Sequence, residues 1–260
     1  MKKIKSFIKK ILINLPLINS IFISLNYKIK KTKIKIHDHT SHEMIMTKRN
    51  YQIYDNSNAG NVTGLDNDMN YEYSFSKKII CEASKEKIFF DIGAAYGHYS
   101  WLASKLYNRV YCFEGDDLEL FFLKRNCSKI SNIKIMENFV DSKFTLDNFC
   151  KLNNLYPDLV KIDVEGDEIN IIKNSSELLK NNSKFLIEFH KRKICKKFLD
   201  KKVIDDFFKT FKEYGYNIEF NKHHEAESLI DRGISDKEWV KINPESHNFA
   251  IFCYPEKISK

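Results

Sequence analysis

Short apolar runs alternate with segments of helical spacing from about residue 85 onward. Five runs of mainly β-branched and aromatic residues predict strands, at 88–90, 110–113, 133–136, 159–162 and 185–187. Between some of them, as in 99–106 and 118–122, apolar residues recur three and four positions apart, which predicts helices. Near-continuous apolar strands separated by helices indicate a parallel sheet that is covered on both faces.

The last part of the chain continues this alternation. An apolar helix face is predicted from Val203 to Phe211, and Gly215 follows it at the position where helices commonly end. Two more strands are predicted at 218–220 and 249–254. The pattern therefore predicts a doubly wound, mostly parallel α/β sheet of about seven strands, with helices on both faces, in one domain over residues 85–256.

The first 37 residues have a different character. Apolar residues from Ile4 to Leu25 follow helical spacing, lysines occupy other positions of the wheel, and Pro16 should kink the helix. We expect a basic amphipathic leader helix within residues 1–37, followed over residues 38–84 by an irregular segment that is a candidate lid. Such a helix can make a peripheral membrane contact, or it can pack on its own domain or a partner subunit, and both interpretations stay open.

Charge and cysteine usage limit the classes of function. The net charge of +8 comes from ten lysines in residues 1–37, and the rest of the chain has two more acidic than basic residues. Arginine is rare, which argues against nucleic-acid binding. The six cysteines form no CxxC pair and indicate free thiols in a reducing compartment. We therefore expect a cytoplasmic protein, with the leader as its only candidate membrane contact.

Polar residues stand at the ends of the predicted strands. They are Asp91, Glu114, Asp163 with Glu165, and Glu188 with His190. Because ligands of doubly wound folds bind beyond the carboxyl ends of the strands, these are the candidate site residues.

The loop after the first of these strands carries a glycine motif. Asp91, Gly93 and Gly97 form the pattern D-x-G-x-x-x-G, in which glycines let the backbone approach a ligand closely. Ala95 stands where a dinucleotide-binding fingerprint requires glycine. Glu114 ends the next strand, where a carboxylate can accept both hydroxyls of a ribose. The pattern favours a nucleoside ligand without a pyrophosphate.

Five stretches carry a resemblance to a known family: FFDIGAAYGHYS (89–100), VYCFEGDD (110–117), FTLDNF (144–149), DLVKIDVEGDEINIIKN (158–174) and FLIEFH (185–190). Over about residues 70–254 the chain resembles the class I S-adenosylmethionine-dependent methyltransferases, and among them the FkbM family. Gly115-Asp116 departs from the Pro-Asp that the family usually shows, and the segment between Met136 and Thr145 is short where adenine contacts are expected.

The resemblance implies a Rossmann-like methyltransferase sheet and S-adenosylmethionine as the cofactor. The residues that it implies in cofactor binding are Asp91, Gly93, Ala95, Gly97, Glu114 and Asp163. It also implies O-methylation of a hydroxyl on a sugar, glycan or secondary metabolite, so the expected partner is a small-molecule or glycan acceptor.

A hydroxyl acceptor needs a base, for which the candidates are His190, Asp163 and Lys161. A neutral imidazole can take a proton near pH 7, so we assign His190 as the base, with Asp163 orienting the cofactor or acceptor and Lys161 paired to it. Lys161 and Asp163 alternate along one strand and share a face, which is also the pattern of a purely structural buried ion pair.

Two other functions remain open at this point. One is a dinucleotide-binding oxidoreductase, and the other is a non-catalytic membrane-surface binding module that keeps the methyltransferase fold. His37, His39 and His42 are too weak a group to indicate a metal, so none is expected.

Overall fold

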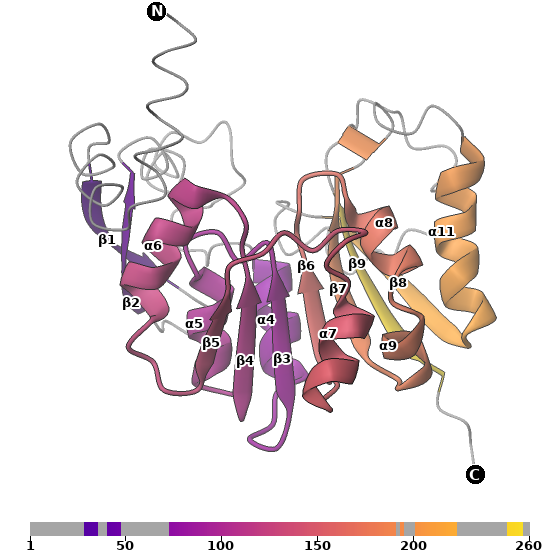
Figure 1. The fold of residues 1–260 in the computed structure, drawn as a ribbon, viewed down its shortest axis with the longest axis horizontal. Helices are drawn as coiled ribbons and strands as arrows, with labels where there is room; N and C mark the ends of the chain where they lie inside the picture. The colour runs from indigo at the N-terminus through magenta and orange to yellow at the C-terminus, as the bar shows by residue number, and fades with distance from the viewer. Residues whose placement is uncertain are drawn as a thin grey trace, which may run out of the picture.

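The computed structural model describes residues 29–35, 41–47, 73–190, 193–194, 201–222 and 249–256. Its centre is a seven-stranded sheet in the order β5-β4-β3-β6-β7-β9-β8 (Figure 1). The strands are β3 (Ile88–Ile92), β4 (Arg109–Phe113), β5 (Ile133–Met136), β6 (Leu159–Ile162), β7 (Lys184–Phe189), β8 (Tyr216–Lys222) and β9 (Phe249–Pro255). All seven predicted strands lie within these bounds.

The strand directions confirm the doubly wound, mostly parallel architecture. Strands β3 to β7 are parallel to one another, whereas β9 runs antiparallel to both β7 and β8. The chain moves outward from β3 through β4 to β5 and then returns to place β6 on the other side of β3. The strand order thus reverses between β3 and β6, and ligands of such folds bind beyond the strand ends at this point.

Helices cover both faces of the sheet. One layer contains α4 (Tyr73–Cys81), α5 (His98–Ser104) and α6 (Asp117–Cys127), and the other contains α7 (Leu146–Asn153), α8 (Glu168–Lys173), α9 (Ser176–Lys180) and α11 (Lys201–Glu213). Because side chains alternate along a strand, Phe89 packs in the first layer and its neighbour Phe90 in the second. This two-sided burial explains why the strands are nearly continuous apolar runs.

Helix ends are fixed by the residues that sequence rules predict. The Asp116 side chain accepts hydrogen bonds from the backbone nitrogens of Leu118 and Glu119 at the start of α6. Gly215 follows α11 with φ of 72°, a left-handed conformation that glycine adopts without strain. The predicted end of this helix is therefore confirmed.

The N-terminal expectations need correction where the structure describes that region. Strand β1 (Ile29–Lys35) pairs antiparallel with β2 (Ser41–Thr47), and β2 lies beside α6. Residues 29–35 of the expected leader are therefore extended, and the segment 38–84, which was expected to be irregular, contains the regular elements β2 and α4. The predicted helical stretch from Ile4 to Leu25 lies outside the described residues, as do His37 and His39.

Two further expectations concern location. In the described parts of the chain, no helix combines the length and the apolar character that crossing a bilayer would need. The cysteines described there, Cys81, Cys112, Cys127, Cys150 and Cys253, are all free thiols, as expected.

Candidate functional site

The loop between β3 and α5 follows the glycine motif closely. Gly93 and Gly97 have φ of 72° and 87°, and a Cβ atom on Gly93 would overlap the backbone carbonyl of Asp163. The amides of Gly93 and Ala94 both donate to the carbonyl oxygen of Phe113, at 3.0 and 3.1 Å. The loop therefore crosses the ends of β4 and β6 so tightly that only glycine fits at position 93.

Beneath this loop lies a buried ion pair. Lys161 Nζ is 3.1 Å from Asp91 Oδ1, and the two side chains are only 2% and 0% exposed. The second oxygen of Asp91 accepts a 2.7 Å hydrogen bond from the Ser100 hydroxyl. Lys161 also donates to the Gly93 carbonyl at 2.9 Å and lies 3.5 Å from Asp163. Lys161 thus holds the ends of β3 and β6 and the glycine loop together, as a positioning residue.

Glu114, directly after β4, organises the other side of the loop. Its carboxylate is buried and accepts a hydrogen bond from the Ala95 amide at 2.9 Å. Its other oxygen accepts from the amides of Gly115 and Asp116, at 2.8 and 2.9 Å. A carboxylate has about four acceptor positions, so roughly one remains beyond these three amides.

Glu119 is a site residue that sequence reasoning missed. Burial raises its pKa to about 7, and the charges of Glu114, Asp116 and Asp163, with a hydrogen bond to Glu114, act in the same direction. The sequence offers only a weak signal, because Glu119 reads as an ordinary acidic residue in the first turn of α6. Its place beside Glu114 depends on how α6 packs.

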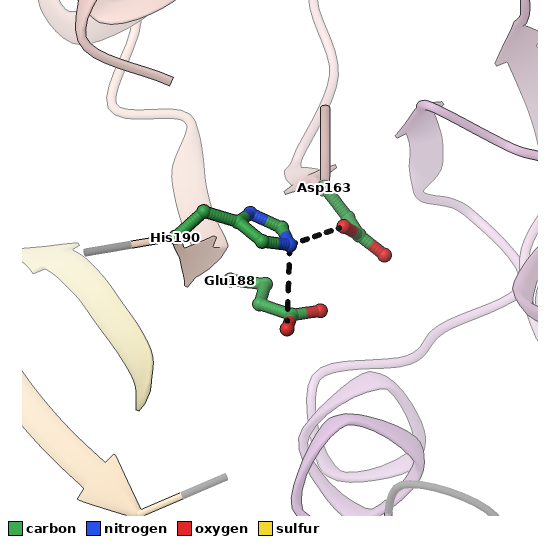
Figure 2. Close-up of side chains that lie close together, drawn as sticks. All are labelled: Asp163, Glu188 and His190. Atoms are coloured by element: carbon green, nitrogen blue, oxygen red, sulfur yellow. Dashed lines mark ion pairs between the residues drawn. The ribbon is translucent and has the colours of Figure 1, made fainter. Parts of the chain in front are cut away.

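Asp163 and His190 come together beyond the ends of β6 and β7, as expected. His190 Nε2 lies 3.6 Å from Asp163 Oδ1 and 3.5 Å from Glu188 Oε1. Figure 2 shows this nitrogen directed at both carboxylates. A third carboxylate, Glu165, is 3.8 Å away at the more exposed rim and pairs with Lys193.

The opposite edge of the imidazole is held by Glu168, which sequence reasoning did not identify. His190 Nδ1 is 2.6 Å from Glu168 Oε1, and Glu168 is fully buried at the start of α8. The chain reaches this position by turning through Glu165 and Gly166, with φ of 62° and 114°. Because an ionised carboxylate only accepts hydrogen bonds, this contact places a proton on Nδ1.

The environment of His190 favours its charged form. Burial lowers the pKa of His190, but the hydrogen bond to Glu168 and the charges of Glu188, Glu168 and Asp163 outweigh burial. The pKa of His190 is therefore raised above its ordinary value.

Comparison with known proteins supplies the family. A family model described as the methyltransferase FkbM domain matches residues 58–218, which is more than half of the chain. The chain belongs to the FkbM methyltransferase family. This membership confirms the family expected from the sequence and the expected cofactor, S-adenosylmethionine. It supports a methyltransferase over the dinucleotide-binding oxidoreductase.

Several solved structures have a similar chain path at low sequence identity. The methyltransferase FkbM of Methylobacillus flagellatus KT shares 16% identity, covering 66% of this chain and 44% of that chain, with a TM-score of 0.45. TYW2 of M. jannaschii, solved with AdoMet, shares 13% identity over 86% of this chain and 84% of its own, with a TM-score of 0.48. The fibrillarin pre-rRNA processing protein of Methanococcus jannaschii shares 14% identity over 87% and 97%, with a TM-score of 0.48. A search of curated proteins found no match.

Proposed function

We propose that this FkbM-family protein transfers the methyl group of S-adenosylmethionine to a hydroxyl group of a sugar, glycan or other secondary metabolite. The observation that carries this proposal is the group formed by Asp163, Glu188 and His190 beside the glycine loop. These side chains can accept hydrogen bonds from a hydroxyl and withdraw its proton. Enzymes that methylate the amino groups of bases often have an aromatic clamp after this strand, where this chain has Asp163-Val164-Glu165-Gly166.

The residues around the glycine loop fit the cofactor. We assign the methionine part to the loop, which can hold its conformation only with glycine at positions 93 and 97, because a Cβ there would overlap Asp163 or Cys127. We assign the ribose to Glu114, at the acceptor position that the three amides leave and that Glu119 also contacts. Ala95 contributes through its amide, which fixes Glu114, while Asp91 and Asp163 supply negative charge toward a cationic ligand. When bound, S-adenosylmethionine supplies an electrophilic methyl group on a positively charged sulfur.

The acceptor is assigned to the other side of Asp163. There the hydroxyl would contact the group of Asp163, Glu188 and His190, which holds it in line and lowers the barrier to losing its proton. Lys161 is 2% exposed, and Glu168 is fully buried. Both therefore act through other residues, Lys161 on the loop and Glu168 on the imidazole.

Cofactor binding is the first test. Calorimetry with the full-length protein should detect S-adenosylhomocysteine and should detect no NAD. Glu114→Gln should weaken S-adenosylhomocysteine at least tenfold, since the charge that strengthens three hydrogen bonds at this carboxylate is lost. The matched control is Glu137→Gln, at a surface residue that is 55% exposed. Unchanged affinity in Glu114→Gln would reject the ribose assignment.

The acceptor class is tested with methyl-labelled S-adenosylmethionine. We expect label in alkali-stable methyl ethers when sugars, glycans and other polyols are offered, and no label in amines. His190→Gln should lower turnover by about 10²–10⁴ while S-adenosylhomocysteine affinity stays within a few fold. Transfer to amines alone would refute the O-methyl proposal.

A further inference from the structure

Asp163, Glu188 and His190 have the composition of a metal-binding site. Each offers one ligand atom, and these atoms all lie within 4.8 Å of one another. The two distances from His190 Nε2, 3.5 Å to Glu188 and 3.6 Å to Asp163, are longer than the roughly 2.7–3.2 Å of ordinary hydrogen bonds. Atoms at this separation are close to one another without bonding directly, which is the spacing of ligands around a shared ion.

The hydrogen bond to Glu168 is an independent observation that points to a metal. Metal-binding histidines usually donate their second ring nitrogen to a carboxylate, which fixes the tautomer and the ring orientation. His190 Nδ1 makes this contact with Glu168 at 2.6 Å. Glu168 Oε1 is itself held by the Gly166 amide at 3.1 Å. In the neutral imidazole, the lone pair of Nε2 is thereby directed toward Asp163 and Glu188, from a ring that is more than nine-tenths buried.

The charge balance of the described residues around the cluster points the same way. Asp163, Glu168, Glu188 and the nearby Asp91 are four carboxylates, and the cationic side chains among them are Lys161 and, when protonated, His190. At the rim, Glu165 and Lys193 compensate each other. Negative charge is expensive to bury, and a divalent cation bound beside the neutral imidazole would offset part of the charge of these carboxylates.

The donor atoms indicate which kind of ion would bind. An ion about 2.1 Å from both Nε2 and a carboxylate oxygen, with the two ligands 3.5–3.6 Å apart, subtends an angle of about 115°, which suits open or tetrahedral coordination. Imidazole nitrogen with carboxylate oxygens suits Mn²⁺, Fe²⁺ or Zn²⁺ better than Ca²⁺, which takes oxygen ligands. We propose that Asp163, Glu188 and His190 bind a divalent first-row cation of the Mn²⁺ or Zn²⁺ type.

This inference deepens the proposed function and rests on it for the role of the ion. A bound cation with an open position would take the acceptor hydroxyl oxygen as a further ligand and lower its pKa. His190 would then serve as a metal ligand in place of the free base assigned from sequence. The expectation of no metal was based on His37, His39 and His42, and not on the combination of Asp163, Glu188 and His190.

The test uses the full-length protein after treatment with EDTA and removal of the chelator. Free Mn²⁺ is followed by electron paramagnetic resonance during titration, and Zn²⁺ is followed by competition with a chromophoric chelator. We expect one ion per chain, and at least tenfold weaker binding in His190→Gln, Glu188→Gln and Glu168→Gln. The matched control is Glu137→Gln, which removes a carboxyl group that is 55% exposed and lies outside the cluster, and which should leave ion affinity within about twofold.

Each sample is also tested for S-adenosylhomocysteine binding and by circular dichroism, so that folding and cofactor failure are recognised separately. The ion should raise the melting temperature of the wild-type protein, and this increase should be absent in Glu188→Gln and His190→Gln. If protein that binds S-adenosylhomocysteine does not bind Mn²⁺ or Zn²⁺ at millimolar concentration, the cation site is overturned and the proposed function stands. Equal ion affinity in the wild type and all three variants would also overturn it. Ion binding without S-adenosylhomocysteine binding would support the site and reject the proposed function.

Discussion

Replacing Lys161 by methionine tests the buried ion pair beneath the glycine loop. Methionine is close to lysine in shape and fills the same space without the charge. Asp91, which is 0% exposed, would lose its 3.1 Å cationic partner and keep the hydrogen bond from Ser100. The Gly93 carbonyl would also lose the 2.9 Å hydrogen bond that holds the loop.

The expected cost is large for a single substitution. Removing one partner of a buried ion pair costs about 3–5 kcal/mol, because the other charge is left buried without compensation. In a domain of about 150–250 residues, each kcal/mol shifts the melting temperature by about 2–4 °C. We therefore expect Lys161→Met to melt about 6–20 °C below the wild type and to lose about 3–5 kcal/mol in free energy of unfolding.

Urea unfolding at pH 7.5, followed by circular dichroism, measures this change. The matched control is Lys134→Met, an exposed lysine on strand β5, which should change the free energy of unfolding by less than about 1 kcal/mol. In the double variant Asp91→Asn with Lys161→Met, neither charge is buried alone, so it should be more stable than Lys161→Met. A loss below about 1 kcal/mol in Lys161→Met, or a double variant less stable than either single one, would refute the argument.

Two further predictions concern the loop and its acidic surroundings. Gly93→Ala should abolish S-adenosylhomocysteine binding in calorimetry, because the new Cβ overlaps the Asp163 carbonyl and residue 93 has a φ of 72°. Ala95→Gly should retain binding, because glycine adopts the φ of 46° at position 95 without strain. In Glu119 the folded state raises the pKa from 4.5 to about 7, so the carboxyl group favours folding below pH 4.5, and this contribution is lost as the pH rises through 7. Glu119→Gln should therefore be more stable than the wild type at pH 8, by at most about 3 kcal/mol, and the difference should vanish in melts near pH 4.5. If Glu119→Gln and the wild type differed in melting temperature by the same amount at pH 4.5 and at pH 8, the raised pKa of Glu119 would be contradicted.

The sheet and the glycine loop could be predicted because their signals are local. Apolar runs such as Val110–Phe113 are buried on both sides and show no competing helical period, and Gly93 and Gly97 mark a turn that few other residues can make. Asp163 and His190 were brought together correctly because the carboxyl ends of adjacent parallel strands must meet at one edge.

The partners of these residues could not be predicted, because they depend on packing between distant segments. Glu168 lies 22 residues before His190, and its contact requires the turn at Glu165 and Gly166 as well as the docking of α8. Strand β1 was missed for a different reason. From Lys31 to Lys35 its lysines alternate with Thr32 and Ile34, which is the period of a strand, but this signal was not used.

The position of β9 in the sheet determines when the site can form during synthesis of the chain. Strand β9 lies between β7 and β8 and pairs Ala250 with Glu188 and Phe249 with Phe189, the residue just before His190. While the ribosome is still making the preceding segments, one edge of β7 has no strand to pair with, and β8 has no link to the sheet. Glu188 is thus supported on both sides only after residues 249–255 have left the exit tunnel, so the site is completed much later than its glycine loop.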